Sequence, residues 1–135
     1  MELFREHMDI AVVREYPTLT LAHIGDCVYE LLARSHVVRS GIFKVSDTHM
    51  KTVALVSAEA QHKAAEALLC MLDDEETALF MRGRNAKPKT VPKHAALEEY
   101  SYATGLETLF GALYLQGKNN RILELWQAAL KELEG

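Results

Sequence analysis

The sequence predicts an all-α fold, a helical bundle of about six or seven helices in a single domain spanning residues 1–135. Apolar residues recur at helical spacing through most of the chain, whereas Val and Ile nowhere alternate with polar residues over a strand length. Only 7 Gly and 3 Pro interrupt the 135 residues. With 49% hydrophobic residues, a chain of this length can bury a core without help from disulfides.

The first long helix is expected over residues 19–40. Pro17 stands before it, Thr18 or Thr20 can cap its N-terminus, and Gly41 suits its end. Its apolar residues follow a helical period. They are Leu21, Ile24, Val28, Leu31 and Leu32.

A second helical region begins near Ser46 or Asp47, either of which can cap a helix. Ser57 can cap a continuation through the alanine-rich segment that follows, so this region forms one kinked helix or two. The acidic run from Asp73 to Glu76 then suits the first turn of a helix, where carboxylates meet the positive end of the helix dipole.

The C-terminal part of the chain predicts two more helices. The first runs from about Leu97 to Gln116 and is ended by Gly117, which can adopt the left-handed conformation common after helices. The second is expected to have Asn119 or Asn120 as its N-cap, because asparagine is a good N-cap residue.

Residues 82–94, RGRNAKPKTVPKH, are expected to form an exposed basic loop, because Pro88 and Pro92 prevent a long helix. They carry five Lys or Arg and no acid, which leaves a charge of −9 on the rest of a chain whose formal net charge is −4. Such a loop is either merely solvated or follows the phosphates and sugar hydroxyls of A-form RNA. The candidate RNA-binding residues are Arg82, Arg84, Asn85, Lys87, Lys89 and Lys93.

Several other classes of protein are disfavoured. Cys27 and Cys70 lack CxxC spacing, which argues against a disulfide framework or thiolate zinc site and fits a reducing cytoplasm. The six histidines show no HExxH motif, and no GxSxG or Walker loop is present. No apolar run approaches the roughly 20 residues needed to span a bilayer. We therefore expect a cytoplasmic protein with no membrane partner.

Two carboxylates stand out because they interrupt apolar helices. Asp26 lies in LAHIGDCVYELL directly after Gly25, and Glu107 lies in ATGLETLFGALYL between Gly105 and Gly111. Small residues let two helices pack closely, so both acids can point into one gap and hold a hard cation such as Mg2+. Such a cation suits phosphodiester hydrolysis. The alternative is that both acids are half-exposed polar residues at the margins of the apolar stripes.

Glu30 is a secondary metal-ligand candidate, because it lies four residues after Asp26 on the same helix face. Its competing role is an intrahelical ion pair with Arg34, again four residues on.

Three blocks together resemble the ribonuclease III family, and within it the small subfamily called Mini-ribonuclease III. They are TLTLAHIGDCVYEL, RGRNAK and YSYATGLETLFGALYL, and the resemblance covers the chain from about Leu19 to Leu130. In this alignment Asp26 matches the family's signature aspartate after glycine, and Glu107 matches its downstream metal-binding glutamate.

The resemblance implies an all-α endonuclease domain without a separate RNA-binding domain. It further implies Mg2+-dependent cleavage of double-stranded RNA, with Mn2+ able to substitute, and homodimerisation. Its expected role is maturation of the large-subunit (23S) ribosomal RNA precursor. In a dimer, a two-fold axis relates one site per subunit to the two antiparallel strands of a duplex. Val28 and Tyr29 are the interface candidates.

The sequence departs from the larger ribonuclease III enzymes at three positions. Leu19 and Ala22 stand where those enzymes have glutamates, and Thr104 stands where they have an aspartate. The small subfamily shares these departures, so activity is expected with fewer ligands. The rivals are a catalytically silent RNA-binding or ribosome-assembly module and a helical interaction protein without RNA.

Overall fold

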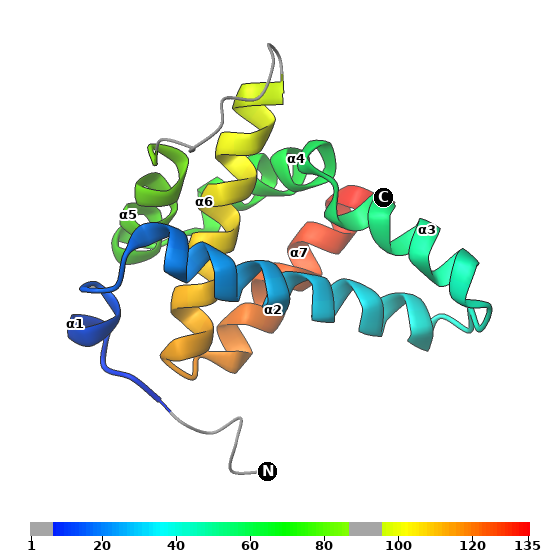
Figure 1. Ribbon diagram of the computed structural model, residues 1–135, viewed down its shortest axis with the longest axis horizontal. Helices are drawn as coiled ribbons and strands as arrows, with labels where there is room; N and C mark the ends of the chain where they lie inside the picture. Colours follow the sequence, from blue (N-terminus) through cyan, green and yellow to red (C-terminus); the bar gives the residue numbers. More distant parts are fainter. Residues whose placement is uncertain (1–6, 87–95) are drawn as a thin grey trace.

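The computed structural model describes residues 7–86 and 96–135, and the described chain is helical throughout, with no strand (Figure 1). The all-α prediction and the expected number of helices are therefore confirmed. The helices are α1 Ile10–Val13, α2 Thr18–Arg39, α3 Val45–Val56, α4 Ala58–Leu68, the short 3-10 helix η2 Leu69–Met71, α5 Asp74–Arg84, α6 Ala96–Leu115 and α7 Asn119–Glu134.

The start and stop signals in the sequence place α2 within one residue of its predicted bounds. Pro17 occupies the N-cap position, and Gly41 has a φ of 92°, a left-handed conformation that glycine adopts without strain. Ser57 resolves the question of one helix or two. Its extended backbone separates α3 from α4, and its hydroxyl oxygen accepts a hydrogen bond of 3.2 Å from Ala60 N.

The acidic run starts α5 as predicted, through a capping box. Asp73 Oδ1 accepts from Glu76 N at 2.8 Å, and Glu76 Oε1 accepts from Asp73 N at 3.0 Å. Glu76 is buried and also accepts from Arg121, which fixes α5 against α7 and lowers the pKa of that carboxyl. The boundary of α7 differs from the prediction, because Lys118, not an asparagine, occupies its N-cap position.

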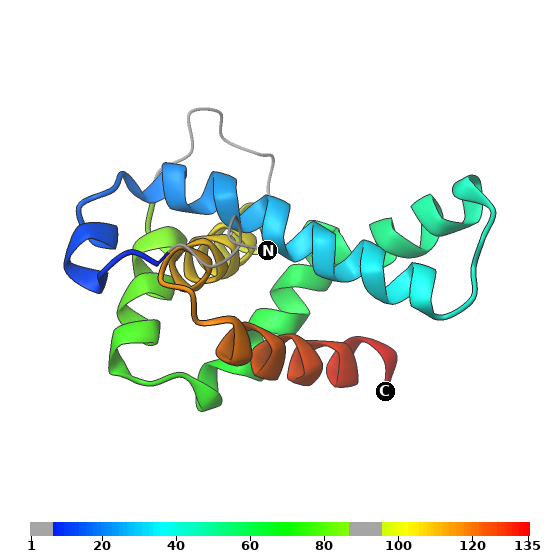
Figure 2. The same cartoon turned by 90° about the horizontal axis from the view of Figure 1, so that it is seen from below.

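Helix α6 lies at the centre of the fold and packs against α2, α4, α5 and α7. Figure 2 shows it nearly end-on, with α2 crossing one side and α7 lying below. Most of its residues are buried, which explains why its apolar positions occur nearly all around the helix. The central core residues that it supplies are Leu106, Leu109, Phe110 and Leu113.

Tyr29 belongs to this core, so the prediction that it lies in a dimer interface is wrong. Its side chain is 1% exposed. The ring meets Phe110 and Trp126 edge-on, with centroids 5.3 and 5.2 Å away, a geometry that aromatic pairs favour. Val28 is half-buried and packs against the same core.

Helices α2 and α6 touch through two glycines. A Cβ on Gly25 would overlap the carbonyl oxygen of Glu107 and lie 2.8 Å from Gly111 N, while a Cβ on Gly111 would overlap the carbonyl oxygen of Leu21. Only glycine permits this backbone-to-backbone contact. The third glycine of the predicted set serves another contact, because a Cβ on Gly105 would lie 2.8 Å from the carbonyl oxygen of Phe80 in α5.

We expect Gly25→Ala to lower the free energy of unfolding by about 1–3 kcal/mol or more, because the added methyl group forces α2 and α6 apart. Helix propensity alone predicts the opposite sign, since alanine gains about 1 kcal/mol over glycine inside a helix. Urea denaturation measures the change, with Gln127→Ala on the exposed side of α7 as the control. A stabilised Gly25→Ala protein would contradict the close contact.

Candidate functional site

The contact between α2 and α6 brings Asp26 and Glu107 together. Gly25, the residue before Asp26, packs directly on the backbone of Glu107. Asp26 is exposed, whereas Glu107 is only partly exposed. The two acids therefore form a surface site in which Asp26 is open to solvent and Glu107 is more enclosed.

Burial and the neighbouring Asp26 carboxylate raise the pKa of Glu107 to about 7, even though a hydrogen bond from Gln61 opposes the rise. Two carboxylates that repel each other in a partly desolvated place are stabilised by a cation between them. Their oxygen atoms are the donors that Mg2+ and similar hard ions prefer. The residues present therefore fit a divalent metal ion.

The site supplies few protein ligands. In residues 7–86 and 96–135, no group of three or more His, Cys, Asp or Glu side chains could hold a metal. Glu30 takes the competing role considered above, because its carboxylate pairs with Arg34 at 3.1 Å. An ion at this site would rest on two carboxylates, with water and substrate oxygens completing its coordination, as Mg2+ sites commonly do.

Gln61 in α4 contacts the site, and sequence reasoning missed it. It is 4% exposed, and its Nε2 donates to Glu107 Oε2 at 3.3 Å and to Val56 O at 2.9 Å. A signal was present, because Gln61 shares its helix face with Ala64, Ala65 and Leu68, which are all buried. A polar residue on an apolar face is often there to meet a buried partner.

Tyr29 lies close enough to Glu107 to interact with its charge. Its hydroxyl is buried and has no hydrogen-bond partner within the described residues. Burial, and secondarily the charge of Glu107, hold the pKa of this phenol above its usual range. Tyr29 is therefore a neutral, buried neighbour of Glu107.

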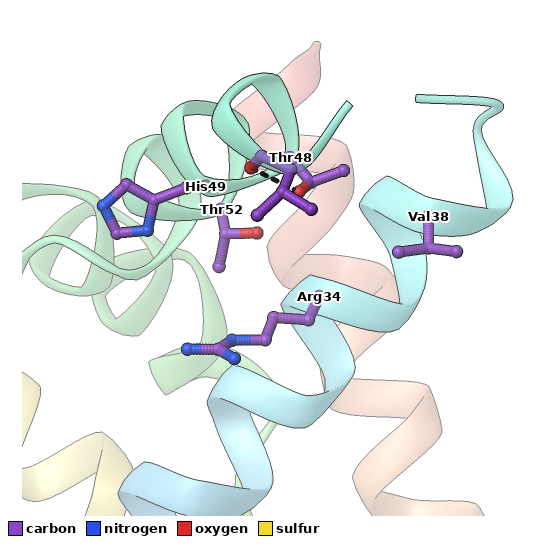
Figure 3. Close-up of a pocket in the computed structure, with 6 residues that line it drawn as sticks. Arg34, Val38, Thr48, His49 and Thr52 are labelled. Atoms are coloured by element: carbon purple, nitrogen blue, oxygen red, sulfur yellow. Dashed lines mark hydrogen bonds between the residues drawn. The ribbon is translucent and has the colours of Figure 1, made fainter. Parts of the chain in front are cut away.

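A pocket of about 290 Å³ lies further along α2, between α2 and α3 (Figure 3). Arg34 reaches toward it from α2, while Thr48, His49 and Thr52 line it from α3, and Thr48 Oγ1 donates to Val45 O at 2.7 Å. Asp26 and Glu107 are not among its lining residues. The paired acids thus lie outside this hollow.

Comparison with known proteins identifies the family. The model of the ribonuclease III domain matches residues 19–118. The chain belongs to the ribonuclease III family. A Mini-ribonuclease 3 from Symbiobacterium thermophilum is 40% identical over 118 residues, which cover 87% of this chain and 91% of the relative. A Mini-ribonuclease 3 from Brevibacillus brevis is 39% identical over 117 residues, 87% of either chain.

The fold agrees with this membership. The crystal structure of a protein from Fusobacterium nucleatum superimposes with a TM-score of 0.79 at 30% sequence identity, and the match covers 87% of this chain and 96% of that one. The resemblance to Mini-ribonuclease III is therefore confirmed, and the chain is an endoribonuclease of the ribonuclease III type. Members of this family act on RNA and generally use a divalent metal. None of the described helices is long and apolar enough to cross a membrane.

The three departures from the larger ribonuclease III enzymes lie on the same two helices as the acids. Leu19 is exposed on α2, whereas Ala22 and Thr104 are buried at 7% and 6% exposure. Thr104 Oγ1 donates to Tyr100 O within α6, so its hydroxyl is already used. None of the three side chains can supply a carboxylate, and the positions of Ala22 and Thr104 are enclosed by the packing of the fold.

The prediction that Arg82 lies in an exposed loop is wrong. Helix α5 continues through Arg84, and Asn85 is its C-cap. Arg82 Nη2 donates to Tyr16 O at 2.8 Å, a carbonyl that the turn at Pro17 leaves without a helical partner. The same nitrogen donates to the Thr18 hydroxyl oxygen, Oγ1, at 3.0 Å. Arg82 therefore ties α5 to the start of α2.

Arg84 and Asn85 remain at the surface in differing degrees. The Arg84 guanidinium lies 5.1 Å from the centre of the Tyr102 ring, a cation–π contact, and Asn85 is exposed. Lys87, Lys89 and Lys93 lie outside the described residues.

We expect Arg82→Ala to lower the free energy of unfolding by about 1–3 kcal/mol, because it leaves the Tyr16 carbonyl and Thr18 hydroxyl without a charged donor. Chemical denaturation measures this, with the exposed Lys63→Ala in α4 as the control. Unchanged stability combined with weaker RNA binding would restore Arg82 to the RNA-contacting set.

The raised pKa of Glu107 predicts how stability depends on pH without metal. Between about pH 4.5 and pH 7, the unfolded chain releases the proton that the folded chain still holds. The free energy of unfolding should therefore fall as pH rises through this window. Above it, Glu107 should cause no further change, because the carboxyl is ionised in both states. Glu107→Gln, which cannot ionise, should remove that fall.

Urea titrations at several pH values, with a chelator present, compare wild type with this variant. Glu30→Gln, at an exposed carboxylate paired with Arg34, is the control and should keep the wild-type pH dependence. Equal pH slopes for wild type and Glu107→Gln would contradict the shifted pKa.

Proposed function

We propose that this chain is a Mg2+-dependent endoribonuclease that cleaves double-stranded RNA, with Asp26 and Glu107 as the metal-holding residues. The observation that carries the proposal is the pairing of these carboxylates across α2 and α6, where burial and the repulsion by Asp26 raise the pKa of Glu107 to about 7. A divalent cation offsets that repulsion, and Mn2+ has a similar preference for oxygen ligands.

Asp26 and Glu107 would hold the ion, which would supply a water of lowered pKa and charge stabilisation at the scissile phosphate. The protein's own contribution is to position the two carboxylates. Asp26 is exposed and can meet a polymer from solvent, while Glu107 is held by packing and by Gln61. No covalent protein nucleophile is needed, because water is the attacking group.

For RNA binding we propose the candidate residues of the basic segment other than Arg82. Arg84, stacked on Tyr102, and the exposed Asn85 lead from α5 into the basic segment. In this proposal, Lys87, Lys89 and Lys93 continue the phosphate contacts. A duplex recognised mainly by its backbone suits such spaced cations and amides.

The active form proposed here is a homodimer in the cytoplasm, acting on the large-subunit ribosomal RNA precursor. Two sites related by a two-fold axis match the two strands of a duplex. Support comes from exposed apolar side chains on the arm that α2 and α3 form at one end of the molecule (Figure 2). A second copy can cover Leu31, Val38, Val45 and Met50, which are 60%, 54%, 80% and 69% exposed.

Cleavage of a radiolabelled RNA duplex tests the catalytic proposal. Wild-type protein should cut duplex RNA with Mg2+ or Mn2+ and stop when a chelator is added. Asp26→Asn and Glu107→Gln should each slow cleavage by about 100-fold or more, because each removes a direct metal ligand. A single strand of the same sequence is the substrate control.

Glu30→Gln is the matched protein control, since it removes a nearby carboxylate without touching the pair. It should cleave like wild type, and a comparable loss would add Glu30 to the ligand set. Cleavage that survives Asp26→Asn or Glu107→Gln would refute the proposed site. Duplex binding without cleavage in either metal would favour the silent RNA-binding module.

A further inference from the structure

Gln61 is a buried, uncharged side chain held directly against the carboxylate pair. Its Nε2 donates to two acceptors, Glu107 Oε2 at 3.3 Å and Val56 O at 2.9 Å. With 4% of its surface exposed, the side chain has little freedom to leave these partners. Gln61 therefore joins α4 to the acid on α6.

The break between α3 and α4 provides the second acceptor that holds the Gln61 amide in place. Helix α3 ends at Val56, and carbonyl groups in the last turn of a helix lack intrahelical partners. Gln61 lies in the first turns of α4, five residues after Val56, and its amide satisfies the Val56 carbonyl. The same amide is thereby fixed in the orientation in which it also reaches Glu107.

We propose that Gln61 is a positioning residue for the divalent metal ion. By holding Oε2 of Glu107, it restricts rotation about the last bond of that side chain and so determines where the other carboxylate oxygen lies. This inference rests on the proposed function, because it assumes that Glu107 binds the ion.

A second feature of Gln61 fits a hydrated cation. Its Oε1 is buried and has no hydrogen-bond partner within the described residues. A buried acceptor without a donor is costly, and a side chain needed only to cap α3 would gain nothing from it. Waters on a metal ion are hydrogen-bond donors, so this acceptor suits their neighbourhood.

The test measures metal binding by the full chain without RNA. Gln61→Met keeps the approximate shape of the side chain and removes the amide. We expect the dissociation constant for Mn2+, measured by calorimetry, to rise at least about tenfold, as is typical when a group that orients a metal ligand is lost. The stabilisation that Mn2+ gives in thermal unfolding should shrink in parallel.

A purely structural role gives a different result. In that case Gln61→Met lowers the melting temperature without metal but leaves the Mn2+ dissociation constant unchanged, which would overturn the inference. If Gln61→Met fails to fold, Gln61→Asn, whose shorter amide cannot span both acceptors, is measured instead with the same expectation. Gln127→Met, on the exposed side of α7, is the control and should bind Mn2+ like wild type.

Asp26→Asn and Glu107→Gln in the same titration separate this inference from the proposed function. If both abolish Mn2+ binding while the folded Gln61 variant binds like wild type, only the role of Gln61 is refuted. If Asp26→Asn and Glu107→Gln themselves bind Mn2+ like wild type, the metal site is refuted, and the inference falls with it.

Discussion

At Gly25 and Gly111 the backbones of α2 and α6 meet with no side chain between them. The pairing of the two acids depends on this contact. It brings Asp26 beside Glu107, helps to bury Glu107 enough to raise its pKa, and packs the Tyr29 ring of α2 against Phe110 of α6. The repulsion between two neighbouring carboxylates is thus imposed by packing, and the core supplies the free energy that holds them together.

Much of this arrangement could be predicted from the sequence, because it depends on signals between residues close together in the chain. Helical spacing gave the fold class, and Pro17, Ser57 and Gly117 mark ends of helices. Glycines beside lone acids gave the approach of Asp26 to Glu107. Each of these signals involves only residues close together in the chain, so it can be recognised without knowing which helix packs against it.

The remaining features depend on which distant residues meet. The basic residues around Arg82 predict an RNA contact, yet its guanidinium binds backbone oxygens 66 and 68 residues away. The prediction of an interface role for Tyr29 fails because its ring packs against Phe110 and Trp126, which meet it only when all three helices are in place. The sequence shows Gln61 only as a polar residue on an apolar helix face, and the fold is needed to show that Glu107 is its neighbour.

Insertions and deletions should affect the site differently before and after the break at Ser57. Before it, α2 and α3 form an arm that extends past the rest of the molecule (Figure 2), so residues added or removed at its tip need not disturb the acids. After it, each inserted residue turns the following side chains by about 100° around α4. One extra residue between Ser57 and Gln61 would aim the amide away from Glu107. Relatives that vary in arm length can therefore share one site, provided that the five-residue spacing from Val56 to Gln61 is kept.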